Sequence, residues 1–180
     1  MNELNKCHFI IPKTNKRCKN SLGLYPHYCF IHTLLNYNVF ISKSNIKNAG
    51  NGLFAGHNGF NKDDIIGMYS TDNNITNQNA VNNNCNITNN NSCWEYVLCD
   101  FQKKGQSTDK VICWDGLNKS STIMRYINDA KNSKYKNNSY FLIKKKKKGN
   151  KMIPVAYVVA SKSIQPYEEI FVNYGRNYWS

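Results

Sequence analysis

The sequence predicts a mostly β domain of the α+β class, built from short antiparallel strands. Brief apolar runs bounded by Asn, Gly and Lys recur along the chain, a pattern typical of small antiparallel ribbons. A Cys-x-x-His pair near the N-terminus, with two cysteines before it, indicates a small separate segment. At 180 residues and 41% apolar content, one full domain and an appendage fit. We therefore expect the appendage at residues 1–36 and the domain at residues 37–180.

Seven apolar runs predict strands, and one further segment predicts a short helix. The expected strands cover residues 39–41, 52–55, 65–69, 94–101, 111–115, 139–143 and 152–160. The expected helix covers residues 118–126, and Ile123, Met124 and Ile127 form its inward-facing apolar stripe. Residues 72–92 are rich in asparagine and offer almost nothing to bury, so we expect a flexible insertion there.

Three cysteines and a histidine in the N-terminal segment have a spacing suited to a metal ion. The pattern is C-x10-C-x10-C-x2-H, formed by Cys7, Cys18, Cys29 and His32, and it resembles small zinc knuckles. Zinc takes four ligands in a tetrahedron, and a segment too short to bury a core would gain its folding energy from the metal. The alternative is a set of buried thiols beside an unrelated histidine.

The remaining cysteines follow no such pattern. The chain has seven cysteines, an odd number, and no export signal, which indicates a reducing compartment with free or metal-bound thiols. We expect Cys93, Cys99 and Cys113 to behave as small hydrophobic residues. The N-terminus is polar and the longest apolar run, residues 153–160, is too short for a membrane span, so we expect a soluble intracellular protein.

The charge of the chain favours an anionic partner. Lys and Arg number 24 against 11 Asp and Glu, a formal net charge of +13. Such a field attracts nucleic acid or a nucleosomal surface; a solvated basic surface without a partner is the alternative. We expect Lys144–Lys148 at the tip of a hairpin. There they would serve as a nuclear import signal, as a phosphate-binding tip, or only as charges that keep the tip soluble.

Three motifs follow one another in the order of a known family. Residues 48–55 are Asn-Ala-Gly-Asn-Gly-Leu-Phe-Ala, residues 125–130 are Arg-Tyr-Ile-Asn-Asp-Ala, and residues 168–175 are Glu-Glu-Ile-Phe-Val-Asn-Tyr-Gly. They resemble the Gly-x-Gly-Leu-Phe-Ala, Arg-Phe-x-Asn-His-Ser and Glu-Leu-x-x-x-Tyr-Gly motifs of the SET-domain lysine methyltransferases. The resemblance implies a SET fold with a C-terminal pseudoknot, S-adenosylmethionine as cofactor, and a lysine of a histone or another protein as substrate.

The resemblance also implies roles for individual residues. Tyr174 would be the catalytic tyrosine, Tyr96 would line the lysine channel, and Asn137 or Asn138 would match a late asparagine of the family. Tyrosine suits such a channel because its ring shields an amine, while its hydroxyl and π-face favour a developing cation. The residues implied to bind the cofactor are Gly50, Asn51, Gly52, Asn128, Asp129, Tyr174 and Trp179.

The sequence departs from the family pattern in three places. Residues 129–130 are Asp-Ala in place of His-Ser, and Tyr167 stands where the family has glycine. No cysteine-rich motif follows Tyr174, so we expect Tyr178 and Trp179 to pack over the adenine or the channel wall instead. Two alternatives therefore stay open: a catalytically inactive SET-like module that binds chromatin or nucleic acid, and a basic nucleic-acid-binding protein unrelated to methylation.

Overall fold

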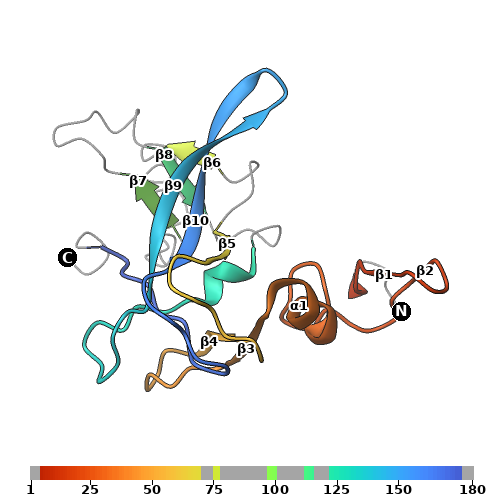
Figure 1. The fold of residues 1–180 in the computed structure, drawn as a ribbon, viewed down its shortest axis with the longest axis horizontal. Coiled ribbons are helices and arrows are strands. Elements are labelled where there is room, and N and C mark those ends of the chain that lie inside the picture. Colours follow the sequence, from red (N-terminus) through yellow and green to blue (C-terminus); the bar gives the residue numbers. More distant parts are fainter. Residues whose placement is uncertain (1–4, 70–74, 78–96, 101–111, 116–121, 176–180) are drawn as a thin grey trace, which may run out of the picture.

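A computed structural model describes residues 5–69, 75–77, 97–100, 112–115 and 122–175 (Figure 1). Within these ranges strands dominate and pair in small antiparallel sheets, which confirms the predicted fold class. The sheets are β1 (Ile10–Ile11) with β2 (Lys16–Arg17), β3 (Val39–Lys43) with β4 (Asn51–Ala55), β5 (Ile65–Met68) with β10 (Lys151–Ala160) and β9 (Ser139–Lys148), and β6 (Ile75–Asn77) with β8 (Ile112–Asp115) and β7 (Val97–Asp100).

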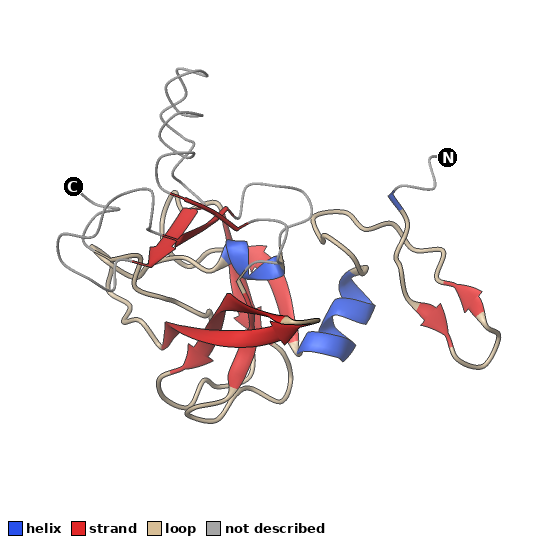
Figure 2. Cartoon of the chain, turned by 90° about the horizontal axis from the view of Figure 1, so that it is seen from above, coloured by secondary structure: helices blue, strands red, loops and turns tan. Residues whose placement is uncertain are grey.

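Helix α1 (Phe30–Tyr37) was not expected from the sequence. It begins after Cys29 and ends at Asn38, which takes a left-handed conformation with φ 51° and donates its N–H to the Leu34 carbonyl. Asparagine adopts this conformation more readily than most residues, so it ends the helix cleanly. In Figures 1 and 2 the helix lies between the β1–β2 hairpin and the larger group of strands.

The helix expected at residues 118–126 is present as one 3₁₀ turn, η5 (Ile123–Tyr126). Residues 118–121 lie outside the described ranges. Ile123, Met124 and Ile127 are buried, as the apolar stripe predicted. Across the described ranges, no helix has both the length and the apolar character needed to cross a membrane.

The β9–β10 hairpin is longer than predicted. Its pairing runs without a break from Ser139 opposite Ala160 to Lys148 opposite Lys151. The five lysines therefore lie within β9, and the tip is Gly149-Asn150, with Gly149 at a positive φ of 58°. The prediction of a lysine tip was wrong because strand pairing with β10 continues through the lysines to the last residue before the turn.

The C-terminal segment, residues 168–175, runs between β4 and the start of β9. On one side the Ile170 N–H donates to the Leu53 carbonyl of β4 at 2.8 Å. On the other side the Ser139 N–H donates to the Phe171 carbonyl at 3.0 Å. Ile170, Phe171 and Val172 are buried, so this segment completes the apolar core as well as the backbone pairing.

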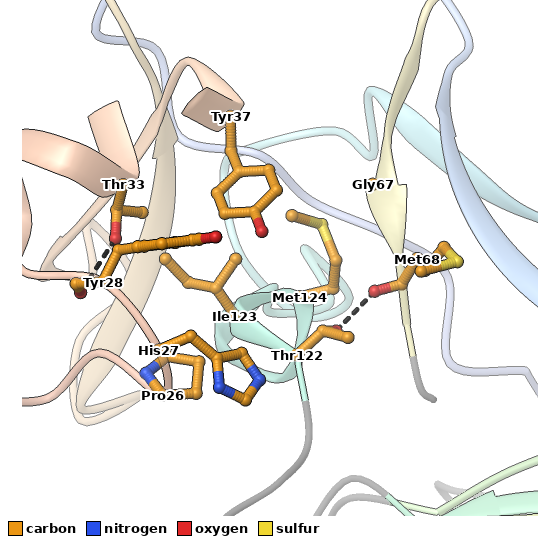
Figure 3. A pocket seen from close by; sticks show the side chains of 10 residues that line it. All are labelled: Pro26, His27, Tyr28, Thr33, Tyr37, Gly67, Met68, Thr122, Ile123 and Met124. Atoms are coloured by element: carbon orange, nitrogen blue, oxygen red, sulfur yellow. Dashed lines mark hydrogen bonds between the residues drawn. The ribbon is translucent and has the colours of Figure 1, made fainter. Parts of the chain in front are cut away.

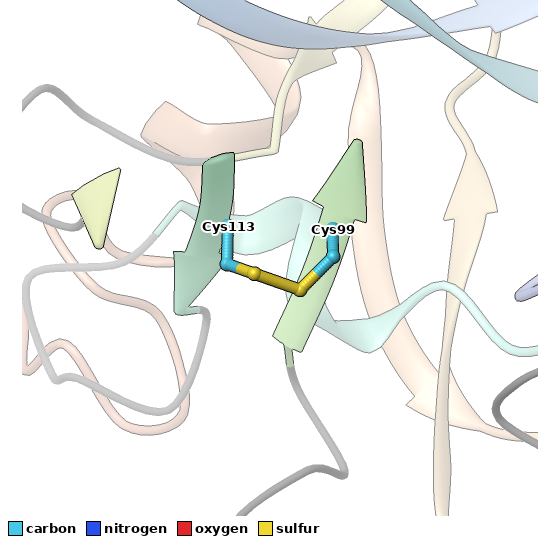
Figure 4. Close-up of a disulfide and its surroundings, with 2 residues drawn as sticks. All are labelled: Cys99 and Cys113. Atoms are coloured by element: carbon cyan, nitrogen blue, oxygen red, sulfur yellow. A yellow bond between two sulfur atoms is a disulfide. The ribbon is translucent and has the colours of Figure 1, made fainter. Parts of the chain in front are cut away.

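Cys99 and Cys113 were predicted to be small hydrophobic thiols in a chain whose thiols are free or metal-bound, and for these two residues both predictions were wrong. The two residues lie directly opposite each other in the β7–β8 pair, with Cα atoms 4.1 Å apart, and their sulfurs form a disulfide (Figure 4). Strand pairing brings the two side chains together on one face, which the sequence separation of 14 residues did not reveal. Cys93 lies outside the described ranges.

Tyr167 occupies a turn position that normally requires glycine. The Glu168 N–H donates to the Gln165 carbonyl at 3.1 Å, Pro166 is the second residue of the turn, and Tyr167 has a φ of +65°. A turn with proline second and a positive φ third favours glycine at the third position. The tyrosine side chain is 64% exposed, so burial compensates little of the backbone cost.

We predict that Tyr167→Gly is more stable than Tyr167→Ala by about 1 kcal/mol, because both remove the ring and only glycine accepts this φ without strain. Denaturant unfolding of the two variants would measure the difference. Tyr140, in strand β9, gives the matched control, since there alanine should be the more stable replacement. An alanine variant at residue 167 as stable as the glycine variant would contradict the prediction.

Candidate active site and metal centre

Tyr174 is held against the segment that contains Asn128. Its hydroxyl donates to the Ile127 carbonyl at 2.6 Å, and its backbone N–H donates to Asp129 Oδ2 at 2.9 Å. Two residues earlier, the Val172 N–H donates to the Asn128 carbonyl at 2.9 Å. The structure therefore brings the second and third sequence motifs side by side.

Asn128 also contacts the first motif. Its side-chain amide donates to the Asn51 carbonyl at 3.0 Å and to Glu169 Oε1 at 3.3 Å. Asn51 is exposed and lies between Gly50 and Gly52. Gly50 has a φ of +69°, and a Cβ added to it would meet no atom within 4 Å. All three motifs thus meet at the Asn128 side chain.

Glu169 was missed by the sequence analysis. It is only 1% exposed, and its carboxylate accepts hydrogen bonds from the Ser44 hydroxyl at 2.6 Å and the Asn45 N–H at 2.7 Å, besides the Asn128 amide. A Cβ on Gly52 would lie 2.9 Å from its Cδ atom, so glycine is needed there to admit the carboxylate. The signal in the sequence was a glutamate directly before the apolar run Ile170–Val172.

Asp129 connects the same two segments through its side chain. The residue is buried, and its carboxylate accepts hydrogen bonds from the Lys131 N–H at 2.9 Å, the Asn137 amide at 3.1 Å and the Tyr174 N–H at 2.9 Å. Hydrogen bonds to a carboxylate are stronger than those between neutral groups. Asp129, which stands where the family has histidine, therefore fixes the position of the Tyr174 backbone.

The two late asparagines both anchor backbone. Asn137 accepts from the Ala130 N–H at 2.9 Å. Asn138 is fully buried; its amide donates to the Glu169 carbonyl at 2.9 Å, and its oxygen accepts from the Phe171 N–H at 2.8 Å. Among the residues that were predicted to form one site, Asn51, Asn128, Asp129 and Tyr174 belong to one hydrogen-bonded network. Tyr96, Tyr178 and Trp179 lie outside the described ranges, so their predicted roles stay predictions.

Comparison with known proteins identifies the family. The sequence model described as the SET domain matches residues 50–175, which is more than half of the chain. This chain belongs to the SET-domain family. A comparison with curated proteins gives no match.

Solved structures share the SET fold. CpSET8 from Cryptosporidium superposes with a TM-score of 0.54 at 22% identity, over 83% of this chain and 62% of that one. A structure of ctPRC2 in an autoinhibited conformation, bound to S-adenosylmethionine, gives 0.53 at 20% identity, over 77% of this chain and 15% of that one. The SET chain described here thus spans less than two thirds of either relative, and at these identities the likeness concerns the fold.

The four predicted metal ligands precede the SET match in the sequence, and their side chains lie close together in the structure. The Sγ and ring nitrogen atoms of Cys7, Cys18, Cys29 and His32 all lie within 4.8 Å of one another. His32 Nδ1 is 3.3 Å from Cys7 Sγ and 3.4 Å from Cys29 Sγ. Tetrahedral zinc with bonds of about 2.0–2.3 Å sets its ligand atoms roughly 3.5–3.8 Å apart, so the donor set fits this ion.

The surroundings of the cluster affect the Cys7 and Cys29 thiols in opposite directions. All three cysteines are buried, and the Asn20 N–H and side-chain amide point to the sulfurs of Cys18 and Cys29 at 3.5 and 3.7 Å. Burial opposes ionisation of Cys29, but hydrogen bonds from the His32 backbone and from Asn20 outweigh it and lower the pKa of this thiol. Burial raises the pKa of the Cys7 thiol. Phe9 stacks on the His32 ring at 3.8 Å and orients it.

A cavity of about 90 Å³ lies between the N-terminal segment and the SET core (Figure 3). Aromatic rings and methionines form much of its wall. The lining residues are Pro26, His27, Tyr28, Thr33, Tyr37, Gly67, Met68, Thr122, Ile123 and Met124. Burial and the nearby His8 lower the pKa of His27. Neither Asn128 nor Tyr174 lines this cavity, so it is distinct from the network of SET motif residues.

We predict that Cys18→Ser abolishes zinc binding, because a hydroxyl replaces one of four ligands. Elemental analysis of the purified chain should fall from about one zinc per chain to nearly none. Hydrogen exchange should then accelerate in residues 5–37, while protection of β9 and β10 persists. Cys85→Ser, which removes a cysteine that is not one of the four predicted ligands, serves as the control. Zinc retained at full stoichiometry in the Cys18 variant would contradict the assignment.

Proposed function

We propose that this SET-domain protein is an S-adenosylmethionine-dependent protein-lysine N-methyltransferase acting on a histone or another basic protein, in the nucleus. The observation that carries the proposal is the meeting of Tyr174, Asn128 and the start of β4 at Asn51 in one network. The division into a zinc knuckle at residues 1–36 and a SET domain at residues 37–180 is part of the same proposal.

Asn128 and the main chain of residues 50–52 would hold the cofactor, with Asp129 beside them. The open space at Gly50 leaves backbone accessible there, and the half-buried Asn128 amide donates to the carbonyl of the next residue, Asn51. When bound, S-adenosylmethionine supplies an electrophilic methyl group. Methyl transfer requires an in-line approach of the lysine nitrogen, so positioning by fixed residues provides much of the rate enhancement.

Tyr174 would position the substrate amine. Because its hydroxyl proton is donated to the Ile127 carbonyl, its oxygen presents lone pairs to a bound amine and accepts a hydrogen bond from it. A lysine has a pKa of about 10.4 in water and must be neutral to react. Removal from water into a channel lined by aromatic side chains disfavours its charged form, which assists the loss of the proton.

A catalytically inactive SET-like module is the second candidate. The observation that favours it is that Asn128 and Asp129 already serve the fold: the Asn128 amide is engaged by Asn51 and Glu169, and the Asp129 carboxylate accepts three donors. In this case the network would stabilise the domain and bind no cofactor.

The test measures cofactor binding by calorimetry and transfer of a labelled methyl group to nucleosomes and free histones. We predict that Tyr174→Phe retains cofactor binding but loses turnover by roughly 10²-fold or more, because only a positioned hydroxyl is removed. Tyr140→Phe, on the partly exposed side of β9, should leave turnover unchanged. Absence of cofactor binding would contradict the proposal and favour the inactive module. Cofactor binding without transfer to nucleosomes or histones would contradict the proposed substrate class.

A further inference from the structure

The distal part of the β9–β10 hairpin forms a two-stranded ribbon with a strong positive charge. Strand β10 pairs with β5 only over Tyr157–Val159, whereas its pairing with β9 continues to Lys151. Residues 144–154, here named the lysine arm, therefore extend beyond the third strand, and in Figure 1 they rise away from the rest of the described chain. A ten-residue strand is about 33 Å long, so the arm has a reach of its own.

The lysine arm carries six lysines, Lys144–Lys148 and Lys151, and all six are exposed. Its sequence, Lys-Lys-Lys-Lys-Lys-Gly-Asn-Lys-Met-Ile-Pro, contains no acidic residue. Counted from its own sequence, the arm has six lysines and no carboxylate, a formal charge of +6.

The strand register distributes these lysines unequally between the two faces. Side chains directly opposite each other point to the same face. Lys144, Lys146 and Lys148 lie opposite Val155, Ile153 and Lys151, so one face carries four lysines. The opposite face carries two lysines, 145 and 147, across from Pro154 and Met152. Neighbouring lysines on one face are about 6.6 Å apart along the strand.

We propose that the four-lysine face of the lysine arm docks on the phosphate backbone of double-stranded DNA. A B-form duplex presents one negative charge per about 1.7 Å of its axis, and its major groove, about 12 Å wide, admits a two-stranded ribbon. The arm has no aromatic residue for stacking on the bases of a single strand. Double-stranded RNA has a narrow major groove that a ribbon cannot enter.

This inference goes beyond the proposed methyltransferase activity and does not depend on it. Ser139, at the start of β9, donates its N–H to the Phe171 carbonyl and so lies beside the segment that contains Tyr174. The lysine arm begins at Lys144, five residue positions further along the strand and about 17 Å from Ser139. A DNA-bound protein could thus reach the site while the arm holds the duplex.

The experiment follows binding of the zinc-loaded full chain to a labelled DNA duplex of about 25 base pairs by fluorescence anisotropy, at several salt concentrations and without cofactor. The variant Lys146→Gln/Lys148→Gln should lower the slope of log affinity against log salt by about two, and the affinity on the order of tenfold, because each lost phosphate contact contributes about 0.9 to the slope. Lys145→Gln/Lys147→Gln, on the opposite face, should have a smaller effect.

The control variant Lys47→Gln/Lys62→Gln changes the net charge equally and lies outside the arm, and both of its lysines are exposed. It should bind DNA almost as the unchanged chain does. Equal losses in the arm and control variants would overturn the proposal, because net charge alone would then explain binding. Tighter binding to single-stranded DNA, duplex RNA or phosphatidylserine vesicles would also overturn it. If the chain binds DNA through the arm but transfers no methyl group, only the proposed methyltransferase activity is contradicted.

Discussion

The buried carboxylate of Glu169 constrains the whole C-terminal half of the structure. It is almost completely removed from water and is surrounded by the Ser44 hydroxyl, the Asn45 N–H and the Asn128 amide. A buried carboxylate without such donors would cost several kcal/mol. The segment 168–175 can therefore insert only where these donors converge, and Gly52 leaves the space that this approach requires. One buried charge thus fixes how three distant parts of the sequence come together.

This constraint has a direct consequence for the proposed chemistry. Tyr174 follows Glu169 by five residues on the same segment, and both its hydroxyl and its N–H are tied to residues 127–129. Its position is therefore set by main-chain contacts and by the Asp129 carboxylate, not by a mobile loop. Reactions that depend on the alignment of two bound molecules gain from such rigidity. The Asp-Ala sequence, although unusual for the family, supplies a contact that strengthens the arrangement.

Local patterns predicted those features that depend on neighbouring residues or on a complete motif. Short apolar runs located strands between residues 39 and 160 but not β1, β2 or β6. Strand β6 (Ile75–Asn77) lies in the segment 72–92 that was expected to be a flexible insertion, so that expectation was wrong at these three residues. The spacing of three cysteines and a histidine located four residues whose candidate ligand atoms lie close together. The three motifs identified residues that do lie together. Long-range register was not predictable: it places Cys99 opposite Cys113 and continues the pairing through the lysines of β9. Glu169 was missed because its burial depends on donors more than 100 residues earlier in the chain.

The most direct measurement is a crystal structure of the chain with S-adenosylhomocysteine bound. We predict that this product contacts Asn128 and the main chain of residues 50–52, with the Tyr174 ring beside its sulfur. A product bound in the cavity beside α1, or bound elsewhere with Asn128 and Tyr174 apart, would show that these residues do not form the cofactor site.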